Sequence, residues 1–87
     1  MYSDPLVETI GQRLRAARKM RGWTQCEVAK QTQHIRQAMI SMYEAGKVIP
    51  SLYTAAYLAR GYRVSVDYLL GLSDDPERGG ITWSKTS

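Results

Sequence analysis

The sequence predicts an all-α domain of five short helices, and three observations support this fold class. Apolar residues recur every three or four positions along most of the chain, which is the spacing of one helix face. Residues that begin helices and glycines that end them divide the chain into short segments. Apolar and polar residues alternate as in a strand only from Ile81 to Trp83, and no internal repeat is present. We therefore expect one compact domain without a sheet.

The first helix is expected from Pro5 to Arg21. Asp4 can serve as its N-cap, and proline suits the first helical position because its φ is already fixed near the helical value. Gly22 then provides a stop. Four apolar residues share one face of this helix: Leu6, Ile10, Leu14 and Ala17. This face is expected to pack on the core.

The second helix is expected to begin at Gln25, and the third to extend from Arg36 to Glu44. Thr24 can cap the second helix, and Glu27 can reach back to complete a capping box. Gly46 can end the third helix in the left-handed conformation. The third helix has one apolar stripe: Ile35, Ile40 and Tyr43. Four side chains point away from this stripe, toward a partner: Arg36, Gln37, Ser41 and Met42.

The fourth helix is expected to follow Ser51, a good N-cap, and to end before Gly61. Its apolar side contains five residues: Leu52, Ala55, Ala56, Leu58 and Ala59. A fifth helix fits Val66 to Leu70, with Ser65 as its cap and Gly71 as its stop.

The composition changes at Ser73 to a segment rich in Asp, Pro, Gly and Ser. We therefore predict a domain over residues 1–72 and a C-terminal tail over residues 73–87. The tail is expected to be flexible, or to associate with a dimer through the alternating segment from Ile81 to Trp83.

Charge is concentrated in the first half of the chain. The 87 residues carry a net charge of +4, and residues 1–47 contain eight Lys or Arg against four Asp or Glu, whereas residues 48–87 contain four of each. A positive face attracts phosphates, although a solvated basic face that only maintains solubility explains the same charge.

Several classes of site and location are not supported by the sequence. One cysteine, Cys26, and one histidine, His34, form neither an internal disulfide nor a set of metal ligands. No apolar run approaches the length of a membrane span, and the N-terminus lacks the order of a signal peptide. We expect a cytoplasmic, nucleoid-associated protein with no cofactor, no membrane partner and no evident small-molecule ligand.

Five blocks of sequence follow one another between Ile10 and Gly71: IGQRLRAARKMRGWTQ, EVA, ISMYEAGKVIPSL, LA and VSVDYLLG. With these blocks, in this order and at nearly this spacing, the chain resembles the Cro and phage-repressor family of helix-turn-helix regulators, often called XRE-like. The resemblance implies a compact five-helix, lambda-repressor-like domain. It also implies that the domain binds duplex DNA as a two-fold dimer and regulates transcription.

Carried onto this sequence, the resemblance assigns five residues to the DNA phosphates: Thr24, Gln25, Arg13, Arg18 and Lys47. Gln25 would grip a phosphate at the N-terminus of the second helix, which positions the protein without reading bases. Arg18 would also pair with Glu44 and tie the first helix to the third. The alternatives are that Arg13 is simply solvated, and that Arg18 and Glu44 are independent surface charges.

The family reads bases with the first part of the third helix, and the corresponding residues here are Arg36, Gln37, Ala38, Ser41 and Met42. Glutamine can make two hydrogen bonds to adenine, arginine can do so to guanine, and alanine or methionine can touch a thymine methyl. Met39 and Met42 could instead fill the core.

The chain departs from the family in the turn between the second and third helices. Thr32, Gln33 and His34 precede Ile35 where the family usually has a leucine and a glycine, and the segment is one residue longer. Without glycine, either another residue adopts the left-handed bend or the second helix continues and the turn widens. The register of the reading residues depends on this turn, and we place it by anchoring on Ile40 and Glu44. His34 either reaches a phosphate or is an exposed turn residue.

These features favour a transcriptional repressor from a phage or mobile element that binds a palindromic operator as a homodimer. Within the same fold, a DNA-binding antitoxin or a restriction-controller protein is an alternative. A protein-interaction adaptor or anti-repressor that has lost DNA binding is an alternative of another class. An enzyme is not expected, because the chain has one histidine, no recognisable catalytic pair of carboxylates and no phosphate loop.

Overall fold

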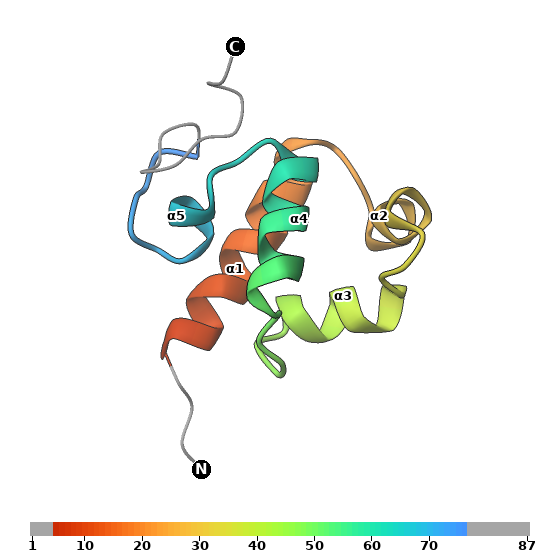
Figure 1. Ribbon diagram of the computed structural model, residues 1–87, viewed down its shortest axis with the longest axis horizontal. Helices are drawn as coiled ribbons and strands as arrows, with labels where there is room; N and C mark the ends of the chain where they lie inside the picture. Colours follow the sequence, from red (N-terminus) through yellow and green to blue (C-terminus); the bar gives the residue numbers. More distant parts are fainter. Residues whose placement is uncertain (1–4, 77–87) are drawn as a thin grey trace.

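The computed structural model describes residues 5–76, and the fold within them is built from five helices. They are α1 (Pro5–Met20), α2 (Gln25–Thr32), α3 (Gln37–Glu44), α4 (Leu52–Tyr62) and α5 (Val66–Leu69). α1 and α4 lie at the centre, with α2 and α3 on one side and α5 on the other (Figure 1). This arrangement confirms the all-α class. The cap expected at Asp4 and the alternating segment from Ile81 to Trp83 lie outside the described residues.

Three helices begin at the caps that the sequence predicts. The Thr24 hydroxyl accepts a hydrogen bond from the Glu27 backbone N–H at 3.1 Å, and the Glu27 carboxylate accepts one from the Thr24 N–H at 2.8 Å. This is the expected capping box. Ser51 accepts from the N–H of Thr54 and thereby caps α4, and Ser65 caps α5 in the same way. Each cap satisfies a backbone donor that the helix itself leaves free.

The predicted end of α4 is wrong, because the helix runs through Gly61 to Tyr62. Arg63, not glycine, takes the left-handed conformation, with φ of 63°. The Val64 N–H then donates to the Ala59 carbonyl at 2.9 Å, and the Val64 side chain is buried. Burial of Val64 therefore holds Arg63 in a conformation that glycine would adopt more easily.

Gly61→Ala is expected to stabilise the domain by about 0.5–1 kcal/mol, because alanine is the better residue inside a helix. A Cβ at this position would meet nothing within 4 Å. Urea unfolding followed by circular dichroism measures the change. Gly71→Ala is the control and should destabilise, since Gly71 has φ of +80° and its Cβ would lie 2.8 Å from Thr9 Cγ2. A loss of stability in Gly61→Ala would contradict the open space described at this position.

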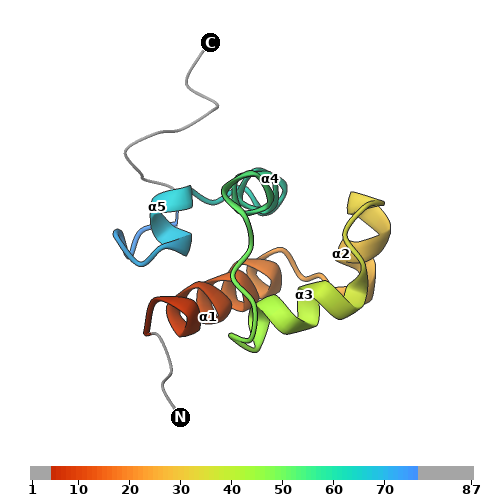
Figure 2. The same cartoon turned by 60° about the horizontal axis from the view of Figure 1, so that its bottom comes forward.

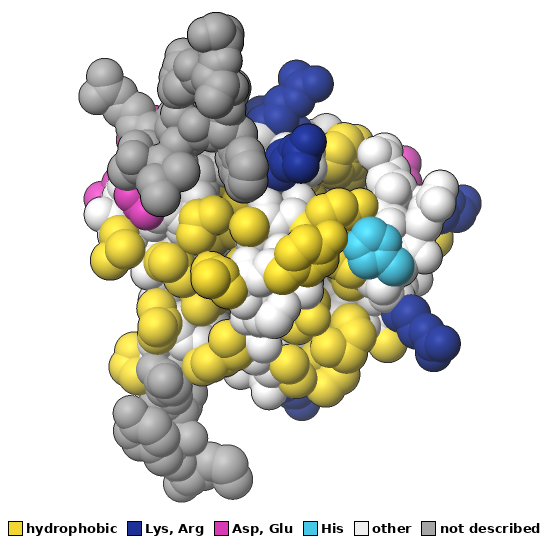
Figure 3. Space-filling view, in the orientation of Figure 1, with side chains coloured by type: hydrophobic (Ala, Val, Ile, Leu, Met, Phe, Trp, Pro, Cys, Tyr) yellow, Lys and Arg dark blue, Asp and Glu magenta, His cyan; other side chains and the backbone are white. Residues whose placement is uncertain are grey.

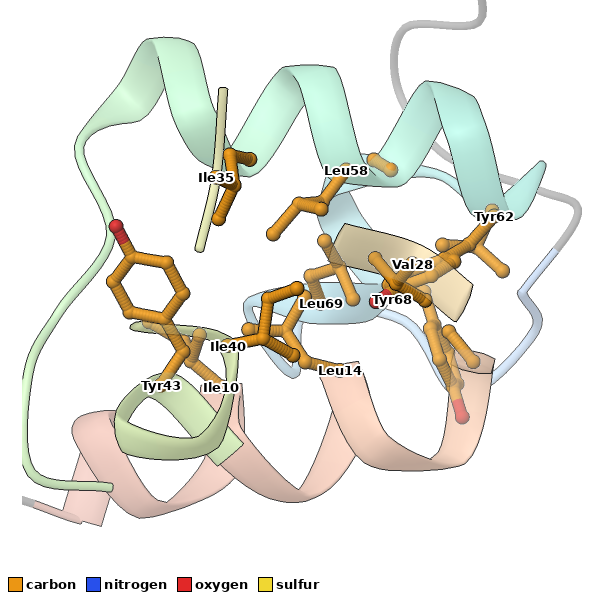
Figure 4. Close-up of a cluster of buried hydrophobic side chains, with 13 residues drawn as sticks. Ile10, Leu14, Val28, Ile35, Ile40, Tyr43, Leu58, Tyr62, Tyr68 and Leu69 are labelled. Atoms are coloured by element: carbon orange, nitrogen blue, oxygen red, sulfur yellow. The ribbon is translucent and has the colours of Figure 1, made fainter. Parts of the chain in front are cut away.

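The hydrophobic core lies where all five helices meet (Figure 4). Its largest fully buried side chains are Tyr62, Leu14, Ile40, Leu69 and Val28. The stripe predicted for the third helix is buried, as expected. The prediction that Leu52 and Leu6 belong to buried apolar faces is wrong, because these residues are 78% and 46% exposed. Both belong to first turns, before α4 and α1 reach the core.

α1 and α3 approach each other very closely at Gly11. A Cβ on Gly11 would lie 2.7 Å from the backbone carbonyl oxygens of both Tyr43 and Glu44. Such a distance is not found between a real Cβ and a carbonyl oxygen, so only glycine fits without a shift of backbone. The C-terminal end of α3 therefore rests directly on the backbone of α1.

Contacts of the described chain continue past the predicted boundary at residue 72. Arg13 Nη1 donates to the Ser73 carbonyl at 2.9 Å, and Arg13 Nη2 pairs with the Asp74 carboxylate at 2.8 Å. The Ser65 N–H donates to the Pro76 carbonyl at 2.8 Å. Residues 73–76 thus fold back onto α1 and the start of α5.

Candidate nucleic-acid interface

The turn between α2 and α3 is closed by Gln33, which has φ of 65°. Its N–H donates to the Ala29 carbonyl at 3.1 Å, and the Thr32 hydroxyl lies 3.3 Å from the same oxygen. Of the two solutions expected for a turn without glycine, the structure has the first, in which another residue adopts the left-handed bend. His34 is exposed, and its ring lies 4.9 Å from the ring of Tyr57 in α4.

α3 exposes one face along its length. The exposed residues on it are Arg36, which is the N-cap, and Gln37, Ala38, Ser41 and Met42. Met42 is 38% exposed, whereas Met39 packs against the core. Figure 2 shows α3 along the lower edge of the domain, with α2 at one end and α1 at the other. The residues expected to read bases therefore share one accessible surface.

Arg18 and Glu44 form a nearly buried ion pair between α1 and the end of α3. Arg18 Nε donates to Glu44 Oε2 at 2.7 Å, and Arg18 Nη2 donates to Glu44 Oε1 at 3.0 Å. The two side chains are only 11% and 5% exposed. The hydrogen bond to Glu44 raises the pKa of Arg18 and outweighs the opposing effect of burial. Burial also raises the pKa of the neighbouring Tyr62 phenol, and Glu44 adds to that shift.

Two further contacts connect this ion pair to the start of α2. Gln25 Nε2 donates to Glu44 Oε1 at 3.0 Å, and Arg18 Nη1 donates to the Trp23 carbonyl at 2.7 Å. Glu44 therefore holds the end of α1, the N-terminus of α2 and the C-terminus of α3 together. The orientation of α3 relative to the N-terminus of α2 is fixed by these side chains as well as by the turn.

The five phosphate candidates lie in different parts of the domain. Thr24 and Gln25 lie at the N-terminus of α2, and Lys47 is exposed just after α3, where its N–H donates to the Met42 carbonyl. Arg13 lies elsewhere, with its guanidinium 4.5 Å from the ring centroid of Tyr68 in α5. Arg18 is buried in its ion pair. Thr24, Gln25 and Lys47 thus lie next to the helix-turn-helix ends, whereas Arg13 and Arg18 are engaged in other contacts.

Gly11 is a structural residue of this site that our reading of the sequence did not single out. It lies inside a helix, next to Ile10 on the core-facing stripe. A glycine at such a position signals either a weak helix or a close backbone approach, and the second explanation applies here. The acceptor role of the Trp23 carbonyl has no comparable signal in the sequence.

Other kinds of site receive no support from residues 5–76. Within that range, no helix is both long and apolar enough to cross a membrane. No group of three or more His, Cys, Asp or Glu side chains could hold a metal ion there.

Comparison with known proteins gives consistent matches. A family model described as helix-turn-helix matches residues 14–69. An uncharacterized HTH-type transcriptional regulator, YobD of Bacillus subtilis, is 44% identical over 66 residues, which cover 76% of this chain and 58% of that protein. The HTH-type transcriptional regulator ImmR of the same organism is 40% identical over 63 residues, covering 72% and 49%. The chain thus spans about half the length of these curated relatives.

Solved structures support the same fold. The DNA-binding domain of BldD superposes with a TM-score of 0.72 at 28% sequence identity, covering 79% of this chain and 99% of that one. The corresponding domain of S. venezulae BldD gives a TM-score of 0.71 at 28% identity, covering 77% and 99%.

Proposed function

Because the chain belongs to the helix-turn-helix family of transcriptional regulators, we propose that it represses transcription by binding a palindromic operator as a homodimer. Membership of this family supports a DNA-binding regulator rather than an enzyme. The proposed source is a phage or mobile element, as the resemblance to phage repressors suggests. Its site of action would be the cytoplasm, where the operator lies.

The observation that carries the proposal is the exposed face of α3. This face presents an amide, a hydroxyl and small or flexible apolar groups beside the Arg36 cation, and the core side of the same helix is buried. A helix of this kind fits the major groove of DNA, which is about 12 Å wide and carries a distinct pattern of donors and acceptors for each base pair. We assign base reading to Arg36, Gln37, Ala38, Ser41 and Met42.

The phosphate contacts are proposed at both ends of the helix-turn-helix. Thr24 and Gln25 lie at the N-terminus of α2, where free backbone N–H groups and the helix dipole favour an anion. Lys47 follows α3 and is exposed. Arg18 acts indirectly in this scheme, because its buried pair with Glu44 positions α3. Arg13 is assigned to the packing of α5 and residues 73–76 instead.

A homodimer would place two α3 helices in successive major grooves about 34–36 Å apart. Occupation of such an operator would exclude RNA polymerase from an overlapping promoter. We propose residues 1–72 as the DNA-binding unit and a role in the dimer for the tail over residues 73–87, of which residues 73–76 pack on α1 and the start of α5.

Gln37→Ala is expected to reduce the affinity for the operator by about 1–3 kcal/mol, because one bidentate contact to a base is lost. The loss should be confined to one base position in each half-site, and fluorescence-anisotropy titration of operators substituted base by base measures it. Gln12→Ala is a matched control, because Gln12 is exposed on α1, outside the helix-turn-helix. An equal loss on every duplex would instead make Gln37 a backbone contact.

A further inference from the structure

A cleft of about 660 Å³ lies between α2 and α4, within the range of small-molecule sites. Two half-buried aromatic residues, Trp23 and Tyr57, line it together with three side chains that are at most 3% exposed: Val28, Leu58 and Tyr62. Its lining also contains three arginines: Arg21, Arg60 and Arg63. Figure 3 shows cationic side chains gathered at the C-terminal end of α4 beside an apolar surface. No residue of α3 lines this cleft, so it is separate from the proposed reading face.

The walls of the cleft are held in place by contacts with the rest of the domain. The ring of Trp23 lies 6.1 Å from the ring of Tyr62, which is almost fully buried. The Trp23 carbonyl accepts a hydrogen bond from the buried Arg18. On the α4 side, Gly61 contributes no side chain, and nothing lies within 4 Å of the position that a Cβ would take. The lining next to Gly61 is therefore open and has room for a flat group.

The charged side chains that line the cleft within residues 5–76 all carry the same sign. Its lining, as far as the structure describes it, contains three arginines and no aspartate or glutamate. All three arginines are exposed, and Arg21 and Arg63 form no ion pair with any of residues 5–76. Guanidinium groups bind carboxylates and phosphates through paired, charge-assisted hydrogen bonds. An anionic ligand would be attracted to Arg21 and Arg63.

From the exposed parts of Trp23 and Tyr57 and the arginines of the lining together, we propose that this cleft binds a small ligand with a flat aromatic body and one carboxylate or phosphate group. The aromatic body would lie between Trp23 and α4, beside Gly61, and the anion would lie at Arg21 and Arg63. The ligand would touch α2 and α4 at once. The site does not depend on the proposed operator, because ligand binding can be measured without DNA.

The test is an NMR titration of the full chain, labelled with ¹⁵N, using 1-naphthoate, 1-naphthyl phosphate and the neutral 1-naphthalenemethanol as probes. Saturable shifts of the Trp23 indole N–H and the Gly61 amide are expected with at least one anion. The neutral probe should bind at least about tenfold more weakly than that anion, because a charge-assisted hydrogen bond contributes more than a neutral one. A response to only one of the two anions identifies the anionic group.

Variants of the cleft decide whether the shifts report this site. Gly61→Phe fills it, and the double variant Arg21→Gln/Arg63→Gln removes two of its cations; each should weaken anion binding at least about tenfold. Arg15→Gln is the matched control, since Arg15 is exposed on α1 and does not line the cleft. If circular dichroism shows that Gly61→Phe does not fold, the arginine variant alone tests whether the shifts report binding in the cleft.

Three results would overturn the proposal: no saturable shift with either anion, equal binding of the neutral probe, or unchanged binding in the folded arginine variant. If the parent chain binds no anionic probe and the arginine variant loses DNA affinity equally on every duplex, Arg21 and Arg63 contact the DNA backbone instead.

Discussion

Replacement of Glu44 by alanine is expected to destabilise the domain by about 3–5 kcal/mol, because it leaves the Arg18 guanidinium nearly buried and without its carboxylate. The side chain of Arg18 is only 11% exposed, so water cannot fully replace the two lost hydrogen bonds. Gln25 loses its acceptor as well. Urea unfolding at neutral pH measures the loss. Glu27→Ala is the control and should cost far less, since Glu27 is exposed.

A double-mutant cycle with Arg18→Ala separates this coupling from the other effects of each substitution. We expect a coupling energy of about 1.5–3 kcal/mol, because removal of the second partner abolishes the unpaired charge that makes each single variant costly. Glu44→Gln keeps one oxygen that can accept a hydrogen bond from Arg18 but loses the charge. Its loss of stability should therefore be intermediate. Strictly additive losses would show that the two side chains do not act as a unit.

Gly11→Ala is expected to destabilise the domain by about 1–3 kcal/mol or more, although alanine normally favours a helix. The added methyl would lie 2.7 Å from two backbone carbonyl oxygens at the end of α3, so either α1 or α3 must move. Affinity for DNA should fall too, since the displacement occurs at the base of the reading helix. Urea unfolding and duplex titration measure the two effects.

Gly61→Ala is the natural comparison for Gly11→Ala, since both substitutions add one methyl inside a helix. The expected effects have opposite signs, because the space around Gly61 is open and that around Gly11 is closed by backbone. A stabilising effect of Gly11→Ala would contradict the close approach of α1 and α3.

Local interactions account for what could be predicted from the sequence. The caps at Thr24, Ser51 and Ser65 each involve a backbone N–H only three residues away, so the sequence itself contains both partners. The exposed face of α3 follows from its helical period. The ion pair of Arg18 and Glu44 was expected only through resemblance to a family, since its partners are 26 residues apart.

Features that depend on distant segments could not be predicted. The end of α4 is set by burial of Val64 rather than by the nearby glycine, Gly61. The resemblance assigns Arg13 to DNA, whereas its partners in the structure, from Tyr68 to Asp74, lie 55 to 61 positions further along the chain. The cleft between α2 and α4 likewise forms only when Trp23 and the last turn of α4 come together.

The most direct test of the account is selection of bound duplexes from a random pool by the folded 87-residue chain in moderate salt. We predict enrichment of two inverted half-sites whose centres lie one helical turn apart, about 10–10.5 base pairs. Affinity for the enriched duplex should fall with salt by a log–log slope of about −0.9 for each phosphate neutralised. If the folded chain enriches no sequence at all, the central claim is wrong, and a protein-interaction module that has lost DNA binding becomes the better account.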